Sequence, residues 1–325
     1  MSDLNYTLTQ SALDIGGVVR RVVDLETGEI ARESAVGSHS RETARAGVPL
    51  SKSHIGRKYR IDNREGLVKV GKLPSVSWYA GASILKTSQG SDGDPVGGGI
   101  RAAIAGFSSD SRRRLMYVIA SIRRDAVLPC FVTLTYPNEF PSPMKSKKHL
   151  KRFCQKLKYK FPDCSAIWKL EPQERGAPHY HLLVWNVEED DLHMFVPMAW
   201  YTIAGNKDEN HLRFHQGRLG NQHCVSAVRS WRGVWSYASK YLGKTFSVAG
   251  WDEVATGRFW GFVNKEKIPF GVLCELELPK KKVFHVMRYQ RRFSKRKIGN
   301  QGFTLFCDAD QWIKNISSEV RQVQE

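Results

Sequence analysis

The chain has 325 residues, and 50 Lys and Arg against 32 Asp and Glu give it a formal net charge of +18. This excess favours a polyanionic partner, and nucleic acid is the commonest one, although a basic ribosomal or membrane-surface protein would share it. Six scattered cysteines with no Cys-x-x-Cys pair argue against a zinc ribbon and a disulfide scaffold. No stretch approaches the ~18 apolar residues of a spanning helix, so we expect a cytoplasmic protein without membrane association.

Three segments are expected along the chain. Residues 1–108 are predicted to be poorly ordered, apart from a short hairpin over 18–30, because 31–66 holds few large apolar residues and 81–99 has the glycine content of a flexible linker. Residues 109–247 are predicted to form the folded domain. Residues 248–325 are predicted to form a basic extension.

The folded domain is predicted to begin with a helix over 115–122, followed by a strand over 131–136. Alternation in this strand places Val132 and Leu134 on one face and Thr133 and Thr135 on the other. A second, amphipathic helix is predicted over 147–161. Its apolar stripe consists of Leu150, Phe153, Leu157 and Phe161, and eight Lys or Arg lie between Met144 and Pro162 with no acidic residue.

A hairpin with metal-binding potential follows this helix. Two strands, 165–171 and 180–185, flank a turn rich in Pro and Gly. In an extended strand His179 and His181 point to the same face, and the hairpin returns Glu171 to their neighbourhood. Two imidazoles and a carboxylate with open positions suit a catalytic cation, and phosphate chemistry points to Mg²⁺ or Mn²⁺. Glu174 in the turn is the alternative third ligand, and a pair of core histidines is the alternative to a metal site.

The residues after the hairpin predict a helix over 187–203, a polar loop over 205–220 and a short strand over 224–228. We interpret His211, His215 and His223 as surface or nucleic-acid-facing residues rather than ligands. The order of helices and strands predicts an α+β protein, with a mostly antiparallel sheet backed by helices.

A helix predicted over 231–246 carries Tyr237 and Tyr241, one turn apart on one flank, each followed three residues later by a lysine, Lys240 or Lys244. Two phenols beside two ammonium groups form a plausible site for a phosphodiester, since lysines attract phosphate and favour phenolate. The alternative is a pair of aromatic residues at the edge of the core, with the lysines in solvent.

The C-terminal segment is basic and aromatic. From Leu278 to Cys307 there are nine Lys or Arg and no acidic residue, interleaved with Phe284, Tyr289 and Phe293. This pattern is typical of single-stranded or origin DNA binding, because charge holds the backbone while rings stack on bases. A basic element whose aromatic residues belong to the core is the alternative.

Three of these segments together resemble a known family. Phe131 to Pro137, Gly176 to His181 and Tyr237 to Lys244 are similar, in order, to the three motifs of HUH endonucleases, and most similar to two-tyrosine rolling-circle replication initiators of small single-stranded DNA phages and plasmids. The resemblance covers roughly residues 126–247 and implies the HUH endonuclease fold, an RRM-like palm.

The resemblance implies a nickase that joins a tyrosine to the 5'-phosphate of DNA, aided by a divalent cation at the histidine pair and an acidic residue. A host helicase and a DNA polymerase are the expected further partners, in a bacterial cytoplasm. A relaxase or single-strand transposase would share the chemistry. A non-catalytic DNA- or RNA-binding protein would share only the charge.

Overall fold

The computed structural model divides the chain into two compact units, each described here by itself. One unit comprises residues 100–119 and 124–269, and the other comprises 1–99, 120–123 and 270–325. Within the described residues, no helix combines the length and apolar character needed to cross a membrane. The structure describes residues 18–23, 30–32, 58–62, 66–70, 74–90, 106–204, 208–217, 224–234, 251, 256–278, 280–293 and 302–322.

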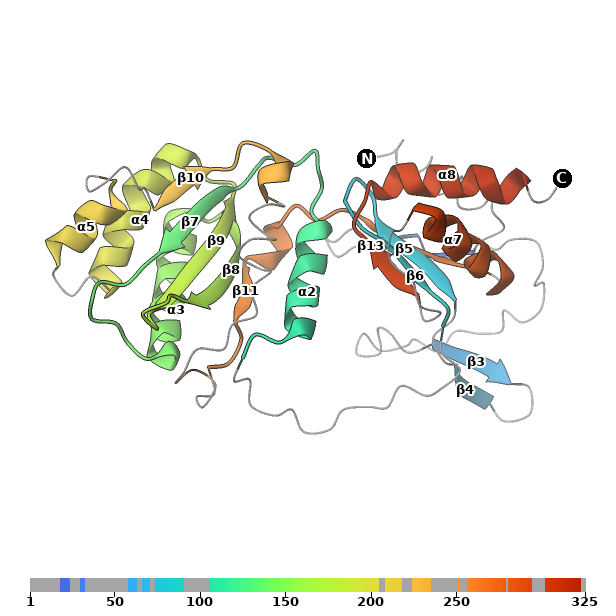
Figure 1. Cartoon of the computed structure of the whole chain (residues 1–325), viewed down its shortest axis with the longest axis horizontal. Coiled ribbons are helices and arrows are strands. Elements are labelled where there is room, and N and C mark those ends of the chain that lie inside the picture. Colours follow the sequence, from blue (N-terminus) through green and yellow to red (C-terminus); the bar gives the residue numbers. More distant parts are fainter. Residues whose placement is uncertain are drawn as a thin grey trace. The chain divides into compact units, whose positions relative to one another are not determined.

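The first of these units is built on a five-stranded sheet in the order β10-β7-β9-β8-β11, in which every neighbouring pair is antiparallel. This confirms the predicted α+β class (Figure 1). Its strands are β7 (Cys130–Leu134), β8 (Ser165–Pro172), β9 (Pro178–Trp185), β10 (Val225–Ala227) and β11 (Trp260–Val263). Its helices are α2 (Ser109–Ala120), which ends at the unit boundary, α3 (Pro143–Lys160), α4 (Glu189–Ala204), α5 (Glu209–His215) and the 3-10 turn η2 (Lys265–Lys267).

The hairpin of β8 and β9 closes as the turn residues predict. Pro172 pairs with Pro178, and Gly176 has a φ of +80°, a left-handed conformation that glycine adopts without steric cost. The guanidinium of Arg175 donates to the carbonyls of Tyr136, at 2.6 Å, and Pro137, at 2.8 Å. The turn is therefore fixed to the chain just beyond β7.

One face of this sheet forms the core of the unit. Tyr180 on β9 is fully buried, and its hydroxyl is 2.7 Å from the Ser146 hydroxyl on α3. Its ring meets Trp200 of α4 edge-on, and Trp200 meets Phe153 of α3 in the same way. Both α3 and α4 therefore pack against the face that carries Tyr180 (Figure 1). The histidines next to Tyr180 in β9 point to the opposite face.

Helix α3 follows its predicted amphipathic pattern. Ser142 caps its N-terminus by accepting a hydrogen bond from the Lys145 backbone N–H, and Pro143 occupies the first turn, where it costs no hydrogen bond. Leu150, Phe153 and Leu157 are buried. The fourth residue predicted for this stripe, Phe161, lies just beyond the helix as its C-cap.

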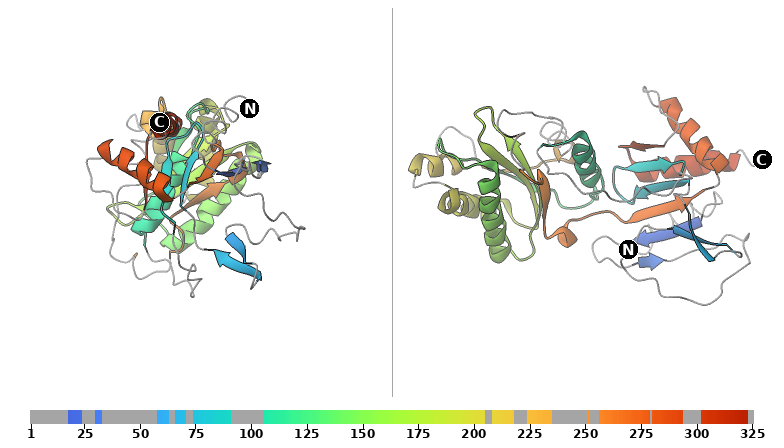
Figure 2. Two further views of the ribbon diagram at one scale, coloured as in Figure 1. Left: turned by 90° about the vertical axis from the view of Figure 1, so that its right-hand side faces the viewer. Right: turned by 90° about the horizontal axis from the view of Figure 1, so that it is seen from below.

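The second unit contains a six-stranded antiparallel sheet in the order β13-β6-β5-β12-β1-β2, and α7 and α8 lie on one side of it (Figure 2). Trp78, Leu276 and Met287 belong to its core. A separate hairpin joins β3 to β4. The bounds are β1 (Val18–Val23), β2 (Ile30–Arg32), β3 (Lys58–Asp62), β4 (Gly66–Val70), β5 (Ser75–Tyr79), β6 (Leu85–Ser88), α7 (Lys280–Phe293), β12 (Leu273–Glu277), β13 (Phe303–Leu305) and α8 (Ala309–Gln322).

This unit confirms the hairpin predicted near the N-terminus, where β1 pairs with β2. The linker predicted over 81–99 is wrong in its first part, because β6 lies there and Leu85 is fully buried. The poor order predicted for 31–66 is likewise wrong at β3, while the glycines at 97–99 lie outside the described residues. The boundaries at 108 and 247 stay predictions, although one sheet joins strands from the first and last segments.

The aromatic residues of the C-terminal segment follow the second interpretation. Phe284 and Tyr289 of α7 pack against the core of their unit, and Tyr289 also contacts Trp312 of α8 at 5.8 Å between ring centroids. These two rings are therefore core residues rather than a stacking surface for bases.

Replacing Phe153 by Ala is expected to lower the free energy of unfolding by about 3–5 kcal/mol, because the ring is fully buried and its removal leaves a cavity. Tyr159→Ala is the matched control on the same helix: its side chain is 91% exposed, and a change of at most about 0.5 kcal/mol is expected. Urea unfolding monitored by circular dichroism measures both. Equal losses in the two variants would contradict the packing of α3.

Candidate functional site

The histidine face of the sheet brings four polar side chains into cross-strand register. His179 on β9 pairs with Glu171 on β8, and His181 pairs with Lys169. The two imidazole rings lie 4.5 Å apart between centroids, and His181 Nε2 is 3.8 Å from Glu171 Oε2. The prediction that the hairpin returns Glu171 to the histidines is therefore correct in space.

Both imidazoles are neutral in this environment. Burial lowers the pKa of His179 to about 4, with a further contribution from the positive charge of Arg175. Burial, the His179 ring and the Lys169 ammonium lower the pKa of His181 well below its ordinary value. Phe131 of β7 stacks on the His181 ring at 5.3 Å. Two neutral imidazoles can donate lone pairs at neutral pH without first losing a proton.

The carboxylate of Glu171 is held by a buried lysine. Lys169 is only 3% exposed, and its Nζ lies 3.3 Å from Glu171 Oε2 and 5.2 Å from the centre of the Phe107 ring. A buried ammonium needs such a partner, because an unpaired charge in this position would be costly. Lys169 therefore keeps the Glu171 oxygen beside the histidines and also competes with any cation for it.

Thr135, just beyond the end of β7, connects the histidine pair to the helices. Its hydroxyl is 3.1 Å from His179 Nδ1. Its backbone N–H donates to His215 Nε2 at 3.3 Å, and its carbonyl accepts from His211 Nε2 and Trp200 Nε1, both at 2.7 Å. A single residue thus ties β9, α4 and α5 together.

These contacts fix the tautomers of the two α5 histidines. Because His215 Nε2 accepts a hydrogen bond, its proton resides on Nδ1, which donates to the His211 carbonyl at 2.9 Å. His211 donates through Nε2. Burial lowers the pKa of both residues, that of His215 to about 4. Both rings are neutral and act as parts of the scaffold.

The donor set at His179, His181 and Glu171 fits a divalent cation by its chemistry, since it offers neutral imidazole nitrogens and a carboxylate oxygen. As the side chains stand, however, no group of three or more His, Cys, Asp or Glu residues in the described part of the chain is close enough to hold an ion. The carboxylate contacts Lys169, and His179 Nδ1 is engaged by Thr135. The third predicted ligand therefore needs a change of side-chain conformation before it could join the others.

One sequence interpretation near the site is wrong. His211 and His215 were interpreted as surface or nucleic-acid-facing residues, but they are 6% and 1% exposed, and α5 occupies part of the predicted loop. The strand predicted over 224–228 is confirmed as β10. His223 lies outside the described residues.

The predicted tyrosine helix is described only at its start, where residues 231–234 are helical. The four side chains predicted to take part in catalysis, Tyr237, Lys240, Tyr241 and Lys244, lie outside the described residues. Their roles stay predictions.

Three features of the site were not identified from the sequence, and each had a signal. Lys169 shares strand parity with Glu171, so it had to lie on the histidine face. Thr135 was placed on the opposite face of its strand from the core residues, which is the face that meets His179. The His211 and His215 pair has the four-residue spacing of helical neighbours.

Fold and site together define an α+β domain with a histidine and carboxylate cluster on one face of an antiparallel sheet. Residues 129–246, about a third of the chain, match the model of a family described as replication-associated protein ORF2. The matched stretch contains the histidine hairpin and both tyrosines of the sequence motifs. Searches of curated proteins and of solved structures gave no match. The family match supports a role in the initiation of DNA replication.

The neutral state of His215 predicts acid sensitivity. The folded pKa of about 4 lies below the ordinary value of 6.5, so unfolding takes up a proton between these limits. The contribution is complete above pH 6.5 and is lost as the pH falls toward 4, amounting to at most about 3 kcal/mol. Urea titrations across this range should show a shallower pH dependence for His215→Gln than for the native chain.

His193→Gln is the control for this measurement. His193 is a partly exposed residue of α4, 3.5 Å from Glu189, and its replacement should leave the slope between pH 4 and 6.5 nearly unchanged. His179, His181 and His211 contribute to the slope in both variants. An unaltered slope in His215→Gln would contradict the assignment of a buried neutral imidazole.

Proposed function

We propose that the chain is a replication initiator that nicks and rejoins single-stranded origin DNA through a covalent 5'-phosphotyrosine intermediate. The observation that carries the proposal is the cross-strand register of the hairpin. It sets His179 opposite Glu171 and brings His181 Nε2 to 3.8 Å from the Glu171 carboxylate, within a segment that matches a replication-associated family. The net charge of +18 suits a nucleic-acid substrate.

The hairpin residues would serve to bind and orient the scissile phosphate. A Mg²⁺ or Mn²⁺ ion held by His179, His181 and Glu171 would supply positive charge at the non-bridging phosphate oxygens. The contact between Thr135 Oγ1 and His179 Nδ1 leaves Nε2 as the nitrogen for that ion and sets the plane of the ring.

A tyrosine would supply the nucleophile. The oxygen of Tyr237 or Tyr241 forms the new bond to phosphorus, the bond from phosphorus to the 3'-oxygen breaks, and the leaving oxygen takes up a proton as the phenol loses one. Lys240 and Lys244 would attract the phosphate and favour phenolate. The released 3'-hydroxyl can prime a DNA polymerase, and the second tyrosine can attack the regenerated origin. A host helicase in the bacterial cytoplasm would supply unwinding.

Mutation of both tyrosines tests the covalent step. Incubated with a single-stranded origin oligonucleotide and Mn²⁺, the native chain should form an adduct that survives denaturing electrophoresis, and Tyr237→Phe combined with Tyr241→Phe should form none. EDTA and His179→Ala should each lower the yield roughly 100-fold or more, because the charge on the phosphate is no longer neutralised. DNA affinity should change little.

An adduct from the double tyrosine variant would overturn the nucleophile assignment. Indifference to EDTA, with unchanged binding in His179→Ala, would leave only a basic DNA- or RNA-binding protein. Sequencing the DNA trapped on the protein separates an origin nickase from a relaxase or a transposase.

Comparison of Glu171→Gln with Glu174→Gln tests the choice of third ligand. Glu171 is partly buried beside His181, whereas Glu174 is exposed in the turn. Glu171→Gln should lower adduct formation at limiting Mn²⁺ by at least about tenfold, with partial recovery at high Mn²⁺, since a ligand rather than the nucleophile is lost. Glu174→Gln should behave as the native chain. The reverse ranking would assign the ligand to the turn.

A further inference from the structure

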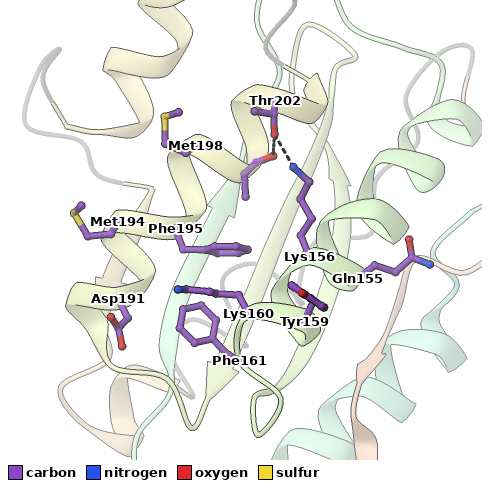
Figure 3. Close-up of a pocket in the computed structure, with 11 residues that line it drawn as sticks. Gln155, Lys156, Tyr159, Lys160, Phe161, Asp191, Met194, Phe195, Met198 and Thr202 are labelled. Atoms are coloured by element: carbon purple, nitrogen blue, oxygen red, sulfur yellow. Dashed lines mark hydrogen bonds between the residues drawn. The ribbon is translucent and has the colours of Figure 1, made fainter.

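A groove runs between α3 and α4 on the helical side of the five-stranded sheet. Its cavity volume is about 870 Å³. Figure 3 shows Met194 and Met198 along one wall, contributed by α4, with Phe195 between the helices and Phe161 below it. The other residues that line it are Gln155, Lys156, Tyr159, Lys160, Asp191, Ala199 and Thr202.

Helix α4 is apolar on two of its faces. Val196 and Trp200 are buried against the sheet, as the core requires. Met194 and Met198, on the outer face, are 79% and 48% exposed, where a surface helix normally carries polar residues. Exposed apolar residues gathered along a groove mark interaction surfaces, and methionines adapt to varied apolar partners because their side chains are unbranched and flexible.

The groove is rigid at its base. The Lys156 ammonium donates to the Thr202 hydroxyl at 3.0 Å, which links α3 to α4, and Thr202 in turn donates to the Ala199 carbonyl at 2.9 Å (Figure 3). Phe161 and Phe195 meet edge-on at 5.4 Å between centroids. A preformed groove of this kind spends little conformational entropy when it binds a partner.

The two rims carry different charges. Lys156 and Lys160 stand one turn apart on α3, a helix with basic residues along its length and no acidic one. Asp191 is the acidic residue in the lining, at the N-terminal end of α4. An occupant therefore needs an apolar ridge for the methionines and negative charge along the α3 side.

A protein helix fits these requirements better than nucleic acid does. The groove lies in the helical layer that covers the Tyr180 face of the sheet, whereas His179 and His181 point to the other face. Bases bind by stacking on ring faces, but Phe161 and Phe195 present edges to each other, and the rest of that wall is thioether.

We infer that this groove binds an amphipathic helix of a partner protein, with its apolar side chains on Met194 and Met198 and its acidic flank along Lys156 and Lys160. From Asp191 to Thr202 the α4 wall extends about 16 Å, which accommodates three helical turns. Anchors spaced at i, i+3 or i+4, and i+7 match that length. This recognition is separate from the DNA chemistry proposed above.

Fluorescence anisotropy with the full-length chain tests the inference. The probe is a labelled synthetic helix of about four turns with leucines on one face and glutamates on the flanks, and its counterpart carries lysines in place of the glutamates. The acidic probe should bind at micromolar concentrations and the basic one at least about tenfold more weakly. Met194→Ser combined with Met198→Ser should weaken the acidic probe at least about tenfold.

Lys156→Glu combined with Lys160→Glu should reverse the preference between the two probes. Met144→Ser is the matched control, since Met144 is 53% exposed on α3 but does not line the groove, and binding should be unchanged. Nicking by all of these variants should equal that of the native chain, so failure of the nickase proposal is seen separately.

Three results would overturn the inference. Equal binding of the acidic and basic probes would remove the charge argument. Competition by a thymidine oligonucleotide, lost in the methionine variant, would assign the groove to DNA. Concentration-dependent dimers in sedimentation, abolished by the methionine substitutions without any probe binding, would assign it to a second copy of the chain.

Discussion

The antiparallel register of β8 and β9 is the constraint on which the site depends. Side chains alternate between the faces of a strand, so this register decides that His179 and His181 stand beside Glu171 while Tyr180 enters the core. A slip of one residue would place both imidazoles against α3 and α4 and expose Tyr180. The turn prevents this, because Arg175 holds it to the carbonyls beyond β7.

Burial of the site then determines its chemistry. The same desolvation that lowers the pKa of His179 and His181 favours neutral imidazoles, which suit them to ligate a cation, and it forces the carboxylate of Glu171 to take a charged partner. Lys169 is that partner. A cation that joined this cluster would have to compete with the ammonium for one oxygen, so the affinity of the site and the stability of the strand pair are coupled.

The parts of the structure that the sequence predicted are those governed by local periodicity. Alternation in β7 and β9 and the apolar stripe of α3 depend on side chains within one element, and all three were predicted correctly. The pairing of β12 with β1 and β5 was missed, because it joins residues more than 190 positions apart and has no local pattern. His211 and His215 were placed wrongly for the same reason, since their burial depends on meeting the backbone of Thr135.

Thr135 shows how one sheet can serve two faces independently. Its hydroxyl reaches His179 on the substrate side, while its carbonyl is held by Trp200, whose ring belongs to the core under α4. The outer face of α4, with Met194 and Met198, is a further layer away from the histidines. Because packed cores resist deformation, the α3 and α4 groove can be occupied without displacing the imidazoles. A protein helix in the groove and DNA on the histidine face are therefore compatible, which an initiator that works with a second protein requires.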